Sequence, residues 1–200
     1  AGRAEPLTIP ERATAIGVWV KPEDRYPNVS LWIVVQDVQG ITMTVSLGQL
    51  GDPQWQLMRA EIPSRLEPPL QFISVQLYEP GFGPTSTPGS LRIDDIHATP
   101  GADGDEYVLD DFEGGVRWSV LTTSRISSDR MTTTSNDVFQ GDRVGLFSFG
   151  KDTNRGIRGI YQSPNGGLIP AVASTSFMDG TGTRVGDVLI AQVMGRLAAF

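Results

Sequence analysis

Short alternations of apolar and polar residues, separated by glycine- and proline-rich turns, fill the first half of this chain. The clearest is LQFISVQLY at Leu70–Tyr78, in which Ile73, Val75 and Leu77 alternate with Phe72, Ser74 and Gln76. Period two is typical of a strand that is buried on one face. The same pattern predicts strands at Ala13–Val20, Val29–Val38, Ile41–Leu47 and Leu91–Ala98 and, from the surrounding strands, at Gln54–Ile62, whereas Ala1–Pro10 is expected to be a leader.

A polar turn at Thr99–Glu106 separates Leu91–Ala98 from a further predicted strand at Tyr107–Phe112. The density of Gly, Pro and Asp in this turn is typical of a short loop, so we expect the two strands to pair. Another strand is expected within Gly141–Gly150, and Ser119–Gln140 is expected to hold one more strand and a long loop.

The pattern changes after Tyr161, where SPNGG interrupts the chain. Beyond it we expect a strand at Leu168–Ala173, a short helix and a strand at Val185–Met194. Ser174 suits the N-cap of that helix and Gly180 its end. The sequence therefore predicts an all-β sandwich over residues 6–162 and a small α+β segment over residues 163–200.

Composition supports the β-rich prediction, because the 23 glycines and 14 prolines are spread along the chain. The net charge of −7 argues against a nucleic-acid partner, which needs a basic surface. The absence of cysteine excludes disulfides, thiolate metal sites and cysteine nucleophiles. No apolar run reaches the roughly 18 residues that span a bilayer. No signal peptide is visible, and we expect the sequence to be an excised piece of a longer protein.

The segments around the acidic turn resemble the two ends of galactose-binding-like jelly-roll sandwiches, the fold of many carbohydrate-binding modules. GSLRIDDI, within Gly89–Ala98, resembles the last strand of such modules, and VLDDFEGGVRW at Val108–Trp118 resembles their beginning. Here the usual end precedes the usual beginning. The resemblance therefore implies a circularly permuted jelly roll joined at Thr99–Glu106. The alternative is two unrelated partial domains.

A second resemblance covers LIPAVASTSFMDGTGTRVGDVLIAQVMGR, which starts at Leu168. It is similar to a recurrent segment in the extracytoplasmic domains of FtsX-like ABC transporter permeases. This implies a non-enzymatic ligand- or partner-binding domain on the extracytoplasmic face of a bacterial cell membrane. Its partners would be the rest of the permease, the ATPase subunit across the membrane and a glycan or protein ligand. The alternative is a carbohydrate-binding module of a secreted or surface protein.

The candidate metal ligands are carboxylates on or beside the two strands that flank the acidic turn. Oxygen ligands from neighbouring strands suit Ca²⁺, and the jelly-roll resemblance implies a structural calcium there. Asp95 and Glu113 match the usual ligands, with Asp94 beside them. The alternative is solvated charges paired with arginines. The single histidine, His97, has no nucleophile motif near it, so we expect no catalysis and no catalytic residues.

Aromatic residues supply the candidate ligand contacts. Trp19, Trp32 and Trp118 lie in apolar strand patterns and are predicted to belong to the core. Tyr26, Tyr78 and Phe82 lie in or near loops and are the candidates for stacking on a sugar ring, an expectation that rests on the resemblance in fold.

Overall fold

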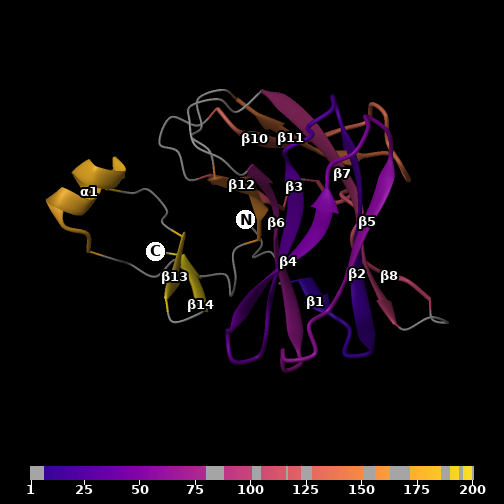
Figure 1. Ribbon diagram of the computed structural model, residues 1–200, viewed down its shortest axis with the longest axis horizontal. Helices are drawn as coiled ribbons and strands as arrows, with labels where there is room; N and C mark the ends of the chain where they lie inside the picture. Colours follow the sequence, from indigo (N-terminus) through magenta and orange to yellow (C-terminus); the bar gives the residue numbers. More distant parts are fainter. Residues whose placement is uncertain are drawn as a thin grey trace.

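Two antiparallel sheets, each with six strands, pack against each other in the computed structural model (Figure 1). This confirms the all-β sandwich. The structure describes residues 7–79, 88–100, 105–115, 117–122, 128–150, 156–162, 172–185, 190–193 and 196–199.

The first sheet has the strand order β4-β3-β6-β12-β9, and β1 also pairs with β6. All of its pairings are antiparallel. Its strands are β1 (Leu7–Ile9), β3 (Ser30–Gln36), β4 (Thr42–Gln49), β6 (Leu70–Glu79), β9 (Ser119–Thr122) and β12 (Gly156–Tyr161).

The second sheet has the order β10-β11-β7-β2-β5, and β8 also pairs with β7. The predicted strand at Gln54–Ile62 is confirmed as β5, and the region expected to hold one more strand holds β9 and β10. The strands of this sheet are β2 (Ala13–Pro22), β5 (Gln56–Glu61), β7 (Gly89–Pro100), β8 (Tyr107–Asp110), β10 (Arg130–Thr134) and β11 (Val144–Phe149).

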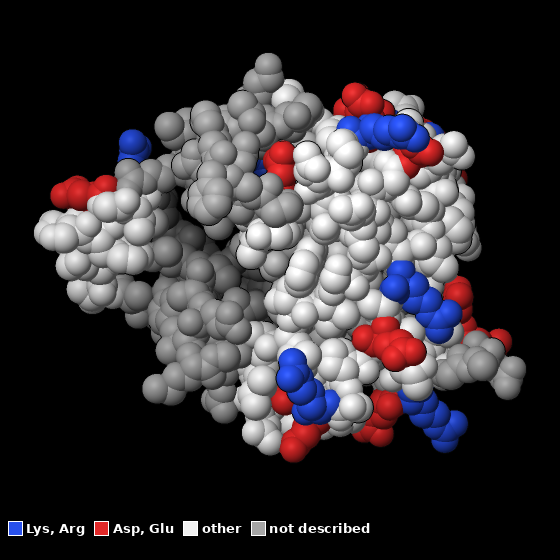
Figure 2. Space-filling model, viewed as in Figure 1, with Lys and Arg blue, Asp and Glu red and all other residues white. Residues whose placement is uncertain are grey.

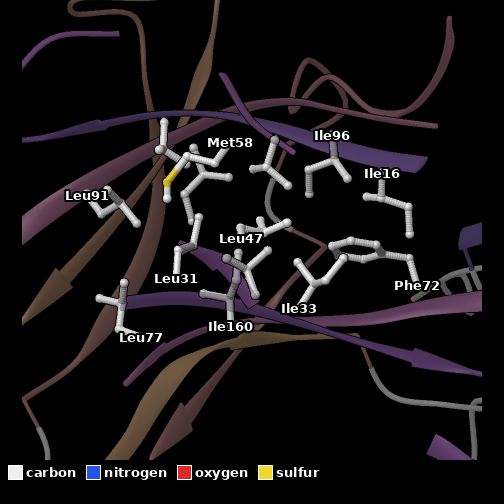
Figure 3. Packing of buried hydrophobic residues seen from close by; sticks show 14 of the residues in the cluster. Ile16, Leu31, Ile33, Leu47, Met58, Phe72, Leu77, Leu91, Ile96 and Ile160 are labelled. Atoms are coloured by element: carbon white, nitrogen blue, oxygen red, sulfur yellow. The ribbon is translucent and has the colours of Figure 1, made fainter. Parts of the chain in front are cut away.

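The chain before the acidic turn and the chain after it contribute strands to both sheets. The predicted pairing across the turn is confirmed, with Ala98 opposite Tyr107 in the β7–β8 pair. Between the sheets lies one cluster of buried apolar side chains, to which Phe72, Ile96 and Ile160 belong (Figure 3). A single core is therefore built from both parts of the chain, and its burial is the main stabilising contribution to the fold.

The end of β12 and the start of β1 occupy neighbouring positions along the same side of β6. Tyr161 lies opposite Ser74, and Leu7 lies opposite Phe72. The Gln162 N–H donates to the Ile73 carbonyl at 2.8 Å, which fills the position between them. Both strands are antiparallel to β6, so β12 and β1 run in the same direction and together continue as if they were one strand.

Strand β7 changes partner in its middle. Its first part pairs with β11 up to Ile93, and its last part pairs with β8 from Ile96. Between them the register with β2 shifts by one residue, and Asp95 has a φ of 40°. A bulge of this kind re-aims side chains. The Asp94-Asp95 pair therefore lies in the short part of β7 that pairs with neither β11 nor β8.

Neither β1 nor β12 was predicted. Strand β1 lies in the expected leader, and β12 contains two glycines that interrupt its alternation. The second of them, Gly159, has a φ of 154°, and a Cβ there would lie 2.1 Å from the Val75 carbonyl oxygen. Only glycine lets the two backbones approach this closely. The sheet therefore requires Gly159, although this glycine interrupts the alternation by which β12 could have been predicted.

After the sandwich come a helix, α1 (Thr175–Thr181), and a hairpin of β13 (Ile190–Val193) and β14 (Arg196–Ala199) (Figure 1). Ser174 is the N-cap, as predicted, because its hydroxyl accepts the Phe177 N–H. The helix ends at Gly182, with a φ of 65°, and not at Gly180. Most of the expected strand at Leu168–Ala173 lies outside the described residues. In the described part of the chain, no helix has the length and apolarity needed to cross a membrane.

Candidate functional site

The outer face of the second sheet carries aromatic, acidic and imidazole side chains in adjacent positions along β2 and β7. Val18 and Val20 of β2 are fully buried in the core. Because strand side chains alternate, Trp19 between them faces outward. In the register of the two strands, Trp19 lies opposite Asp94 and Gly17 lies opposite His97.

Residues 135–143, which connect β10 to β11, fold against this outer face and are called the 135–143 loop below. Phe139 stacks on Trp19, with 3.9 Å between ring centroids and 18° between ring planes. The ring centroid of Trp55 lies 5.6 Å from that of Phe139. These three half-buried rings form an aromatic cluster on the surface of the sheet.

Two carboxylates hold the 135–143 loop through its backbone. Asp94 Oδ2 accepts the N–H groups of Phe139 and Gln140, both at 3.2 Å. Glu113 Oε1 accepts those of Asp142 at 2.7 Å and Arg143 at 2.9 Å. Hydrogen bonds to an ionised acceptor are stronger than neutral ones, so the loop is anchored at its middle and at its C-terminal end.

Burial makes the charged form of Asp94 less favourable than it would be in water. Its side chain is buried, and this burial raises its pKa from 3.8 to about 6, although three backbone N–H groups, from Gln140, Asp95 and Phe139, act in the opposite direction. Asp94 is therefore mostly ionised at neutral pH and gains a proton in mildly acidic solution.

Asp137, at a φ of 58°, ties the same loop to β2 and β7 by charge. Its carboxylate lies 2.7 Å from Lys21 Nζ and 3.7 Å from Arg92 Nε. The hydrogen bond from Lys21 is the main reason why the pKa of Asp137 lies below its usual value. Charged groups of both signs thus flank the aromatic cluster.

The Asp110-Asp111 pair at the end of β8 resembles the Asp94-Asp95 pair in that its first residue is buried. Asp110 is buried, and its Oδ2 accepts the indole N–H of Trp118 at 2.9 Å while its Oδ1 accepts the Phe112 N–H at 2.8 Å. Burial raises the pKa of Asp110. Trp118 belongs to the core, as predicted, whereas Trp19 and Trp32 do not, because both are only half-buried.

The structure does not bring the three predicted calcium ligands together. Asp94 and Glu113 direct oxygens at backbone N–H groups of the 135–143 loop, and their role as calcium ligands stays a prediction. Among the described residues, the group whose ligand atoms converge within 4.8 Å consists of Asp95, His97 and Glu106. Only Asp95 of the predicted set belongs to it.

His97 lies between two carboxylates. Its Nδ1 is 3.0 Å from the Asp95 carbonyl oxygen and 3.5 Å from Asp95 Oδ2, and its Nε2 is 3.7 Å from Glu106 Oε1. Burial opposes the imidazolium charge, but the hydrogen bonds to Asp95 and the charges of Asp95 and Glu106 outweigh it, so the pKa of His97 is raised. The neighbours of this ring are acids, which do not form a nucleophile–base pair with it.

Two of the predicted sugar-stacking aromatics, Tyr26 and Tyr78, lie apart from this face. Tyr26 is 5% exposed and packs edge-to-face on Phe149 in the core, so little of its ring is accessible to a ligand. Tyr78, which is 38% exposed, lies on β6 and contacts Trp32 edge-to-face. Phe82 is outside the described residues. The patterns missed Phe139 and Trp55, although Phe139 is the one aromatic residue in the turn-rich segment SNDVFQGD.

A groove of about 900 Å³ lies beside the start of β2 and the end of β5. Its charged lining residues, Glu11, Arg59 and Glu61, are all exposed. On the face drawn in Figure 2, acidic and basic side chains lie next to one another toward the top, the bottom and the right, and uncharged side chains lie between these groups. The outer face of the second sheet therefore remains the richest candidate site among the described residues.

Comparison of this chain with protein-family models, with curated proteins and with solved structures finds no match.

Proposed function

We propose that this chain is a non-enzymatic, extracytoplasmic binding domain of an FtsX-like ABC transporter permease. The observation that carries the proposal is the order of elements. A complete sandwich is followed by a short helix that begins at Thr175 and by the hairpin β13–β14, in the segment with the permease-like pattern. The sandwich would hold a ligand or a partner protein outside the membrane, while the ATPase subunit works inside.

We further propose that the sandwich is a circularly permuted jelly roll of the galactose-binding-like type. Two facts support this. The strands that resemble the usual end and the usual beginning are antiparallel neighbours, β7 and β8. Strand β12 is followed along β6 by β1, at consecutive register positions. An unpermuted relative would run through that point without a break, and termini that lie close together make such rearrangement tolerable.

Cysteine labelling tests the location. The chain contains no cysteine, so Val38→Cys, at a position 57% exposed, adds one reactive thiol to these residues. In intact cells that make the full-length parent protein, a membrane-impermeant maleimide should label this variant above the unsubstituted parent. Val18→Cys, at a fully buried position, is the matched control. An ATPase subunit should copurify with the parent, and labelling only after cell lysis would contradict the proposal.

The second candidate function is carbohydrate binding, and the aromatic cluster of Trp19, Trp55 and Phe139 favours it. Aromatic rings beside hydrogen-bonding groups are the usual means of holding a sugar, and Lys21, Arg92 and Asp137 supply such groups here. This assignment moves the expected sugar contact from Tyr26, Tyr78 and Phe82 to the outer face of the second sheet.

A glycan array with the 200-residue chain tests this second candidate. We expect a signal for the unsubstituted chain that Trp55→Ala removes. The matched control is Trp32→Ala, which removes another half-buried tryptophan from the outer face of the other sheet. A flat array, or equal losses in the two variants, counts against carbohydrate binding at the cluster and leaves the permease proposal unaffected.

A further inference from the structure

The group formed by Asp95, His97 and Glu106 contains two buried polar atoms that have no hydrogen-bond partner. His97 is 1% exposed, yet its Nε2 has no hydrogen-bond partner, and Asp95 Oδ1 is likewise buried without one. Buried polar atoms are nearly always hydrogen-bonded, so two buried atoms without a partner in one group need an explanation. From these atoms we propose that the three side chains form a binding site for a divalent transition-metal ion such as Zn²⁺.

The orientation of the imidazole fits metal binding. Nδ1 lies 3.0 Å from the Asp95 carbonyl oxygen, and a proton on Nδ1 can donate to it. This tautomer leaves the lone pair on Nε2, which lies 3.7 Å from Glu106 Oε1. Metal-binding histidines commonly donate their other N–H to a carbonyl or carboxylate, which fixes the ring in place.

The surroundings leave room at Nε2. Gly17, opposite His97 in the neighbouring strand, has no side chain, and a Cβ there would lie 2.4 Å from Nε2. Glu106 is 54% exposed, whereas the side chain of Asp95 is 13% exposed. The site is thus buried on the strand side and open on the Glu106 side, which provides the entry path that a metal ion needs.

The donor set indicates the class of ion. One imidazole nitrogen and two carboxylates are ligands that Zn²⁺ and related divalent ions accept. Ca²⁺ takes oxygen ligands, so His97 disfavours it. Three protein ligands leave at least one coordination position for water. The inference stands independently of the proposed function, because it uses neither the permease resemblance nor the aromatic cluster.

The test uses the untagged 200-residue chain, stripped with a chelator and titrated with ZnCl₂. His97 is the only histidine, so its imidazole ¹⁵N signals can be followed by NMR without assignment. We expect one Zn²⁺ per chain, a large shift of the Nε2 signal and a rise in melting temperature with Zn²⁺ concentration. Binding without a shift at His97, or no binding at all, overturns the proposal.

Glu106→Gln is the decisive variant, because Glu106 is exposed and its loss leaves the core intact. Outer-shell partners alone are worth roughly 10–100-fold in metal affinity, so losing a direct ligand should weaken Zn²⁺ binding at least that much. The control is Glu61→Gln, an equal charge change at an exposed position of β5. Equal affinity in Glu106→Gln and the unsubstituted chain overturns the site, and so does saturation by Ca²⁺ in place of Zn²⁺.

Discussion

Gln162 and Leu7 occupy consecutive positions along one side of β6, although 154 residues separate them in the sequence (162 − 7 − 1). The Gln162 N–H bonds to the Ile73 carbonyl, and Leu7 lies opposite Phe72. The chain enters and leaves the sheet at this point, so β6 is bordered by two separate segments where one continuous strand would fit.

A permuted chain tests this relationship. Residues 105–162 are joined directly to residues 7–100, which removes the acidic loop and places the new ends there. Because β12 and β1 are already in line, we expect cooperative unfolding within about 2 kcal/mol of the stability of the parent sandwich. Circular dichroism and urea unfolding provide the measurement.

The control for this chain is the same fusion without Gln162. Deleting one residue shifts β1 by one position and turns its side chains to the opposite face of the sheet. Leu7 and Ile9, which are buried, would then face outward. Equal stability of the two fusions would show that β12 and β1 do not form one continuous strand along β6.

Much of this architecture can be predicted from pattern alone. Most strands from β2 to β8 follow from their β-prone patterns and the turns between them, whereas β5 follows only from the surrounding strands. Ser174 supplies its own cap signal. Strand β12 was not predicted because Gly159 has no side chain that could indicate which face of the strand is buried. Strand β1 was not predicted because three residues are too few to show a period.

The site is harder to predict than the fold, for a physical reason. Sequence places Asp94, Asp95 and Glu113 on neighbouring strands, but it does not show that the bulge at Asp95 separates their directions. Nor does it show that backbone N–H groups of the 135–143 loop reach Asp94 and Glu113. Phe139 meets Trp19 only after that loop has folded back, a contact that no local period encodes.

The Asp110–Trp118 hydrogen bond should contribute measurably to stability. Trp118→Phe keeps an aromatic ring in the core but removes the donor to buried Asp110 Oδ2. We expect a loss of about 1–3 kcal/mol in the free energy of unfolding, measured with urea, because the acceptor is left unsatisfied. Trp32→Phe is the control, since the Trp32 indole N–H has no hydrogen-bond partner. A similar loss in both variants would point to ring size as the cause.

Asp94 should make stability depend on pH in a defined direction. Its pKa is raised to about 6 in the fold from the ordinary 3.8, so the folded chain binds more protons than the unfolded chain between about pH 4 and pH 6. The contribution of Asp94 to the free energy of unfolding therefore falls as pH rises through that window. The stability of the unsubstituted chain minus that of Asp94→Asn should fall from pH 4 to pH 7 in urea titrations.

Asp105→Asn serves as the control for this pH dependence, because Asp105 is exposed. A flat difference curve for Asp94→Asn would mean that the folded chain does not raise the pKa of Asp94.

Gly159 should be among the least replaceable residues of the sandwich. In Gly159→Ala, the new methyl group would meet the Val75 carbonyl oxygen at 2.1 Å. We expect a loss of about 3 kcal/mol in the free energy of unfolding, because backbone must move to relieve the overlap. Gly180→Ala, in α1, is the matched control: nothing lies within 4 Å of its Cβ position. Its melting midpoint should stay unchanged or rise slightly, and equal losses would contradict the close approach at Gly159.

The acidic anchors have a consequence for how the charge of this protein acts on its surroundings. Asp94, Asp110 and Glu113 direct oxygens at N–H dipoles of their own chain. These N–H dipoles weaken the negative field close to each oxygen, but they carry no net charge, so at a distance the protein still acts with its formal charge of −7. Removing an exposed acid would change only this outer field, whereas removing Asp94, Asp110 or Glu113 would also leave backbone N–H groups without their acceptor.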